Sequence, residues 1–107
     1  MKINRKGYRA AAKGAAAESL VEADLLLRGL EVTRPTVDFG DDLHARFSVG
    51  WRSVQVKTRD IRRKLWRPSD HRKRVTSEIL ALVDSVTREI RYVRASRERL
   101  PKELVDG

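Results

Sequence analysis

Two polar side chains on a valine-rich stretch are the first residues whose types and spacing could do chemistry. Gln55 and Lys57 lie two residues apart in SVQVKTRD, alternating with Val54 and Val56. Alternate side chains of a β-strand share a face, so this pattern predicts a strand with both valines in the core and both polar groups on the other face. Such a pair is usually only the wet face of an amphipathic strand, so its meaning depends on the residues around it.

Acidic residues stand upstream of this pair. Asp42 lies thirteen residues before Gln55 and beside Asp41, and Glu18 lies in an earlier Ala- and Leu-rich stretch. Aspartate between two strands is often simple turn chemistry. If the two strands pair as a hairpin, however, Asp42 lies near the Gln-x-Lys pair at one edge of the sheet. A helix packed on that face would bring Glu18 to the same place.

This set of groups suits metal-assisted hydrolysis of a phosphodiester. Mg²⁺ prefers oxygen ligands and usually takes one or two carboxylates together with water and phosphate. We expect Asp42 to be the main ligand, with the Gln55 side-chain oxygen and the Val56 backbone carbonyl completing the protein's share. Glu18 would hold a second metal or a metal-bound water. The metal lowers the pKa of a bound water, and Lys57 would orient that water or stabilise the transition state electrostatically.

The charge of the chain indicates a polyanionic partner. Its 107 residues include 24 Lys and Arg against 15 Asp and Glu, a net charge of +9. Residues 1–13 hold five basic residues and no acid, and residues 59–74 hold eight basic residues and two acids. Two such segments are typical of a nucleic-acid-binding protein, with an acidic membrane surface well behind. The candidate DNA contacts are Lys6, Arg9, Lys13, Arg59, Arg62, Arg63, Lys64, Trp66, Arg67, Arg72, Lys73 and Arg74.

Composition narrows the class of protein further. The chain has no cysteine, which excludes disulfides and thiolate metal sites. No apolar run approaches the roughly 20 residues of a membrane span, and the basic start lacks the apolar core of a secretory signal. We expect a cytoplasmic, nucleoid-associated protein of one small domain over residues 1–107, with a basic arm at 1–13 and a basic segment at 59–76.

Periodicity and turn residues predict one helix and five strands. The helix is expected over 14–28, with Gly29 as its C-terminal cap and the first turn left open. Its apolar positions are Ala16, Leu20, Ala23, Leu27 and Leu30, with Ala17 and Val21 beside them. Strands are expected at 30–35, 43–48, 51–58, 78–84 and 89–95, with a tight turn at Val49-Gly50. The tail after them is either a helical turn or frayed.

At these residues the sequence resembles the PD-(D/E)xK nuclease superfamily. The resemblance rests on KGAAAESLVEADLLLRGLEVTRP, DDLHA and VQVKT, and it covers roughly residues 13–94. It is closest to small bacterial and phage members in which Gln replaces the acid of the last motif, among them endonucleases of group I introns; Holliday-junction resolvases are similar. Glu18 matches the helix acid, Asp42 the central metal ligand, and Gln55 with Lys57 the QxK motif.

The resemblance implies a fold and an activity. The fold is α/β (α+β), a restriction-endonuclease-like αβββαβ core around a central mixed β-sheet. The activity is Mg²⁺-dependent DNA cleavage, with Mn²⁺ as a substitute, on duplex or branched DNA. The assembly is a homodimer or homotetramer.

Two departures from the family pattern keep alternatives open. The Pro expected before the catalytic Asp is replaced by Asp41, so the metal carboxylate is either Asp41 or Asp42; Asp42 is preferred because Leu43 follows it and opens the strand. Gln55 removes one negative charge, which lowers metal affinity unless Asp41, Asp38 or the substrate compensates. The alternative function is therefore a catalytically inactive DNA-binding or assembly protein on the same fold.

Four more side chains have competing interpretations. His44 is a phosphate contact or a spectator, and His71 is a DNA-facing donor because no second ligand stands at zinc spacing. Trp51 is expected to pack against the helix. Trp66 lies among basic residues, where it either stacks on or wedges between bases or anchors a partner subunit.

Overall fold

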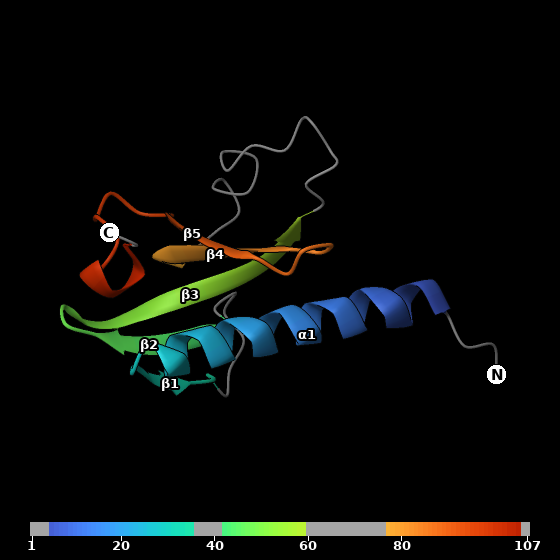
Figure 1. Ribbon diagram of the computed structural model, residues 1–107, viewed down its shortest axis with the longest axis horizontal. Coiled ribbons are helices and arrows are strands. Elements are labelled where there is room, and N and C mark those ends of the chain that lie inside the picture. Colours follow the sequence, from blue (N-terminus) through green and yellow to red (C-terminus); the bar gives the residue numbers. More distant parts are fainter. Residues whose placement is uncertain (1–4, 36–41, 60–76, 106–107) are drawn as a thin grey trace.

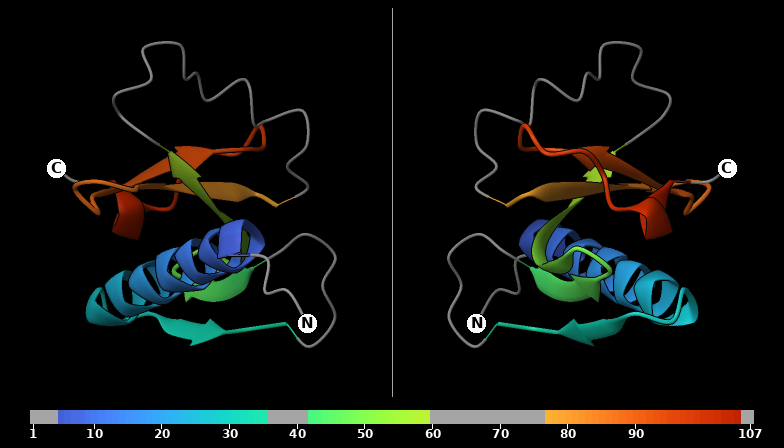
Figure 2. Two further views of the ribbon diagram at one scale, coloured as in Figure 1. Left: turned by 90° about the vertical axis from the view of Figure 1, so that its right-hand side faces the viewer. Right: turned by 90° about the vertical axis from the view of Figure 1, so that its left-hand side faces the viewer.

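A long helix lies along one face of a twisted five-stranded sheet (Figures 1 and 2). The computed structural model describes residues 5–35, 42–59 and 77–105. Its elements are α1 (Arg5–Leu27), β1 (Glu31–Thr33), β2 (Leu43–Phe47), β3 (Gly50–Arg59), β4 (Ile79–Asp84), β5 (Ile90–Arg94) and the 3-10 turn η1 (Lys102–Leu104). The small α+β fold with a mixed sheet is confirmed. In the described ranges no helix is long and apolar enough to cross a membrane.

The sheet is mixed at its central strand. The strands lie in chain order, and β3 pairs antiparallel with β2 but parallel with β4. The β1–β2 and β4–β5 pairs are antiparallel. A parallel pair needs a crossover connection, and here it runs through residues 60–76. The second helix of the expected αβββαβ core falls on those residues, which lie outside the described part of the chain.

The buried face of α1 differs from the predicted one. Ala17, Val21 and Leu25 are buried at steps of four residues, whereas Leu27, a predicted core position, is 88% exposed. Ala16 and Ala23 are exposed as well. The predicted stripe was therefore right at Leu20 and Leu30 and wrong at its other three positions, because an alanine-rich helix offers small side chains on several faces.

The end of α1 matches the predicted glycine cap. Gly29 has a φ of +83°, its N–H donates to Leu26 O at 2.9 Å, and the N–H of Leu30 donates to Leu25 O at 3.2 Å. These two bonds form a Schellman motif, which needs a left-handed residue at this place. The turn buries Leu30 and directs the chain into β1.

The core lies between α1 and the sheet. Val54 is fully buried and Val56 packs at the margin of the core, as predicted from their alternation. On β5, Tyr92 packs in the same layer, and its hydroxyl donates to Asp24 Oδ2 on α1 at 2.6 Å. The helix therefore covers the valine face of β3, and the prediction that it packs on the face of Gln55 and Lys57 was wrong.

The β2–β3 hairpin departs from prediction at two points. Phe47 pairs with Gly50, so the two turn residues are Ser48 and Val49, one position earlier than predicted. Trp51 lies opposite Arg46 and is 45% exposed, on the face of the sheet away from α1. Its expected packing against the helix was wrong, because it has the parity of Gln55 and the helix covers the other parity.

Candidate active site

An irregularity at the start of β2 positions Asp42. Leu43 is the register partner of Val54, yet the N–H of Asp42 also donates to Val54 O, at 3.2 Å. Asp42 and Leu43 thus both lie opposite Val54, as in a β-bulge, and a bulge redirects the side chain that it carries. Asp42 is therefore not held in the regular alternation that would place it over Gln55.

The carboxylate of Asp42 lies at the edge of β3. Its Oδ2 accepts the backbone N–H of Val56 at 2.7 Å. In the antiparallel ladder, alternate residues of β3 direct both backbone polar groups toward β2, and Val56 has the same parity as Val54. The expected carbonyl ligand of Val56 therefore belongs to the same edge as the Asp42 carboxylate.

Glu18 reaches this edge from the helix. Its carboxyl lies within hydrogen-bonding reach of the Asp42 carboxyl. Burial is the largest cause that raises the pKa of Glu18, followed by the charge and the hydrogen bond of Asp42, and the nearby Arg34 opposes the rise. Two carboxyl groups brought together this closely repel each other when both are ionised, and a cation between them relieves that repulsion.

Arg34 is a member of this cluster that the sequence did not predict. Its Nη1 lies 3.2 Å from Glu18 Oε2, and its Nε lies 2.7 Å from Glu22 Oε2. The hydrogen bond to Glu22 is the largest cause that raises the pKa of Arg34. Glu18 and Glu22 lie one helical turn apart on α1, so one guanidinium spans both. Only the packing of the end of β1 beside α1 reveals this contact.

Gln55 and Lys57 lie on the other face of the sheet. They pair with Leu80 and Leu82 of β4, which are fully buried. Gln55 is itself 9% exposed, and its Oε1 has no hydrogen-bond partner in the described part of the chain. A buried amide oxygen without a donor is costly, and it is the kind of atom that a cation or a donor from a ligand satisfies.

The candidate site thus straddles one edge of β3. The structure brings together Glu18, Asp42 and the Val56 backbone on the helix side, and it places the side chains of Gln55 and Lys57 on the opposite side of the same strand. Beyond Val54 this strand extends past the end of β2. Among the described residues, the pairing of β2 with β3 ends at Val54, and the Asp42 carboxylate occupies the next backbone donor along that edge, the Val56 N–H.

The donor set fits Mg²⁺. Two carboxylates, an amide oxygen and a backbone carbonyl are hard oxygen donors, and Mg²⁺ usually takes one or two carboxylates from the protein. Among the described residues, no group of three or more His, Cys, Asp and Glu side chains is arranged to bind a metal.

Several predicted residues fall outside this geometry. His44 pairs with Ser53 in the ladder. Arg9 and Lys13 are exposed on α1. The remaining predicted site residues lie outside the described residues or side chains: Lys6, Asp38, Asp41, Arg59, Arg62, Arg63, Lys64, Trp66, Arg67, His71, Arg72, Lys73 and Arg74.

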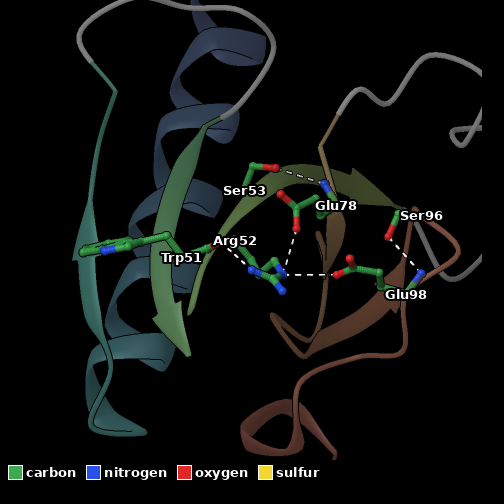
Figure 3. Close-up of polar contacts among 6 residues, drawn as sticks. All are labelled: Trp51, Arg52, Ser53, Glu78, Ser96 and Glu98. Atoms are coloured by element: carbon green, nitrogen blue, oxygen red, sulfur yellow. Dashed lines mark hydrogen bonds and ion pairs between the residues drawn. The ribbon is translucent and has the colours of Figure 1, made fainter. Parts of the chain in front are cut away.

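A second arginine-centred cluster lies at the other end of β3 (Figure 3). Arg52 Nε lies 3.0 Å from Glu78 Oε2 and 3.2 Å from Glu98 Oε2. Its Nη1 donates to the Trp51 carbonyl at 2.9 Å, and Ser53 Oγ accepts the Glu78 N–H at 3.0 Å. This cluster ties β3 to the residue before β4 and to the segment after β5.

Comparison with known proteins supports the fold. No known protein family matches the sequence, and no curated protein matches it at a significant level. Among solved structures, the chain is similar to the bacterial homing endonuclease I-Ssp6803I, with a TM-score of 0.58 and 17% identity over 87% of this chain and 84% of that one. The chain therefore has an endonuclease-like fold.

Proposed function

We propose that this chain is a Mg²⁺-dependent DNA endonuclease of the PD-(D/E)xK type. The observation that carries the proposal is the meeting of the Glu18 and Asp42 carboxyls at the β3 edge, beside the strand that bears Gln55 and Lys57. The sequence spacing, the endonuclease-like fold and the net charge of +9 support the same function.

Each residue has a distinct role in this proposal. Asp42 is the main metal ligand, and its hydrogen bond from Val56 N–H holds the carboxylate at the edge of β3. Glu18 adds a second carboxylate or binds a metal-bound water. Gln55 Oε1 and the Val56 carbonyl complete the protein's donors. The bound Mg²⁺ supplies an acidified water and offsets charge on the phosphate.

Lys57 supplies the positive charge that the metal ligands lack. It is half-buried on β3, two residues beyond Gln55. An ammonium at this place orients the attacking water or stabilises the charge that develops on the phosphate.

The biological setting that fits this site is an assembly of identical chains acting on DNA. One chain offers one candidate site, whereas a double-strand break needs two cuts, and two-fold symmetry supplies both. The structural neighbour is a homing endonuclease, so a homing-type substrate is one candidate and a branched junction the other.

Plasmid nicking tests this function. Purified protein is incubated with supercoiled plasmid in Mg²⁺ or Mn²⁺, in excess chelator, and as the Asp42→Asn variant. Glu98→Gln is the matched control, because it makes the same carboxylate-to-amide change in the Arg52 cluster. We expect metal-dependent nicking by the wild type and Glu98→Gln, and none by Asp42→Asn.

Two results would contradict the proposal. Nicking that persists in chelator or in Asp42→Asn would place the chemistry elsewhere. No cleavage of plasmid or branched DNA, together with metal-independent DNA binding, would identify an inactive DNA-binding protein on this fold.

A further inference from the structure

A cleft of about 510 Å³ opens beside the candidate site. It lies between the middle of α1 and the C-terminal ends of β3 and β4, which point to the same side of the molecule (Figure 1). Ala17, Leu20 and Val83 contribute its apolar lining. Lys13 on α1 and Arg88 after β4 contribute two cations, and Asp84 contributes one carboxylate, whose Oδ2 has no hydrogen-bond partner among the described residues. Its volume is within the range of pockets that bind small organic groups.

The cleft is continuous in sequence with the candidate site. Its lining includes Ala17 and Ser19, which flank Glu18, and Thr58, which follows Lys57. The cleft therefore borders the stretches of α1 and β3 that carry Glu18 and Lys57.

The turn that carries Arg88 is firmly built. The side chain of Asp84 is fully buried, and its Oδ1 accepts the N–H groups of Val86 at 2.8 Å and Thr87 at 3.2 Å. The backbone of Asp84 is also bonded to Arg88 N–H and Glu89 O, both at 2.9 Å. The position of Arg88 at the cleft is thus set by four hydrogen bonds that fix the turn.

Arg88 adopts a conformation that its residue type disfavours. Its φ is +65°, and it is the one non-glycine residue with positive φ in the described part of the chain. Glycine or asparagine occupies the left-handed region at lower cost. The Arg88 side chain is exposed, and none of the ion pairs found among the described residues involves it. Strain of this kind is often retained where a side chain has a function.

We propose that this cleft binds the nucleotide of the DNA strand that adjoins the scissile phosphate. Lys13 and Arg88 bind its phosphate, and the apolar lining contacts the sugar or base. The inference rests on the proposed function, because it takes the β3 edge as the place of the scissile phosphate. It adds a substrate subsite to that function, and it assigns Lys13 and Arg88 the role of positioning the DNA strand.

The decisive variant is Arg88→Gly, measured by fluorescence anisotropy with labelled duplex DNA in chelator, where no cleavage occurs. Glycine suits the positive φ, so the thermal unfolding midpoint stays the same or rises. DNA affinity falls about tenfold, as expected for loss of one charged contact, and the log–log salt slope falls by about 0.9. Arg97→Gly, which removes the same charge from an exposed bend after β5, leaves both quantities unchanged.

A second variant tests the open volume of the cleft independently of its charge. Ala16 is an exposed α1 residue that lines the cleft, so Ala16→Phe fills the cleft without changing the net charge. We expect it to weaken DNA binding at least fivefold, with the salt slope unchanged. The inference is overturned if Ala16→Phe binds DNA like the wild type, or if Arg88→Gly and Arg97→Gly lose affinity equally.

These outcomes are distinct from failure of the proposed function. The binding measurements need no metal and no cleavage, so they test the cleft even in a protein that does not cut DNA. Conversely, the wild type could nick plasmid while Arg88→Gly and Ala16→Phe both bind DNA with wild-type affinity. That result would keep the proposed function and overturn this subsite.

Discussion

The two arginine-centred clusters have the same parts and different chemistry. Arg52 and Arg34 each lie between two glutamates within 3.2 Å. Around Arg52, the two acids belong to different segments, the residue before β4 and the segment after β5, and the arginine ties these segments to β3. Around Arg34, one of the acids, Glu18, also meets a third carboxyl, that of Asp42.

The third carboxyl is what distinguishes the Arg34 cluster from the Arg52 cluster. In the Arg52 cluster, one arginine against two acids leaves a formal charge of −1, and Arg94 and Arg99 line the same small pocket. One arginine against three acids leaves −2, and the pKa of Glu18 is raised by burial and by Asp42. A carboxyl pair that is partly desolvated and incompletely neutralised is a place where a divalent cation binds favourably.

The largest expected effect comes from removing Lys57, the proposed catalytic cation on the strand beside the Glu18–Asp42 pair. Lys57→Ala lowers the cleavage rate by about 10²–10³-fold, because a preorganised charge at the phosphate is lost. DNA affinity measured by anisotropy in chelator changes less than twofold, since the basic segments carry the binding. Arg52→Ala, on the same strand, retains the cleavage rate when assayed well below its unfolding midpoint. Full activity of Lys57→Ala contradicts the site assignment.

The next effect concerns the second carboxylate. Glu18→Gln lowers the cleavage rate by about 10–100-fold and raises the Mg²⁺ concentration needed for half-maximal activity. The matched control is Glu22→Gln, one turn along α1, which removes the negative charge that pairs with Arg34 at 2.7 Å. We expect its Mg²⁺ requirement to stay within about twofold of the wild type. An equal shift in both variants means that Glu18 acts only by pairing with Arg34.

The role of the Arg52 cluster is tested by the free energy of unfolding rather than by the rate of DNA cleavage. Arg52→Ala leaves Glu78 and Glu98 without their shared partner and lowers the free energy of unfolding by about 1–2 kcal/mol. Thermal denaturation detects this as a midpoint roughly 5–10 °C lower. Arg91→Ala, at an exposed position of β5, changes the free energy by less than about 0.5 kcal/mol. If the two variants are equally stable, the cluster has no structural role.

The smallest effect is the pH dependence of the metal-free protein. The folded-state pKa of Glu18 is raised above its ordinary value of 4.5, so the folded state binds this proton more tightly than the unfolded chain. The resulting stability is present below pH 4.5 and is lost as pH rises through the raised pKa. Unfolding midpoints measured in chelator therefore show a component that falls with pH in the wild type and is absent in Glu18→Gln. If this pH-dependent component of the unfolding midpoint persists in Glu18→Gln, it comes from another titrating group.

Local patterns predicted most of the fold. The alternation of Val54 and Val56 with Gln55 and Lys57 identified the strand and its buried side, and Gly29 marked the end of the helix. The helix face was mistaken because Ala16 and Ala17 are both small enough for the core, and only packing on the sheet decides between them. Trp51 was misplaced for a related reason, since its parity was known but the covered face was not.

The arrangement of the candidate site was predicted only in part. The structure brings Glu18 and Asp42 together beside Val56, whereas the side chains of Gln55 and Lys57 lie on the opposite face of the same strand. The bulge at Asp42 depends on how β2 pairs with β3, so no local pattern indicated which face the carboxylate would take. Arg34 joins Glu18 only through the packing of the end of β1 beside α1, and residues sixteen positions apart carry no such signal.

The central claim is that the Glu18–Asp42 edge binds a divalent cation and the Arg52 cluster does not. Titration of Mn²⁺ into the protein, followed by electron paramagnetic resonance, tests it directly. We expect one bound ion per chain in the wild type and in Glu98→Gln, and none in Asp42→Asn at the same metal concentration. Equal Mn²⁺ binding by the wild type and Asp42→Asn, or loss of binding in Glu98→Gln, would contradict the account.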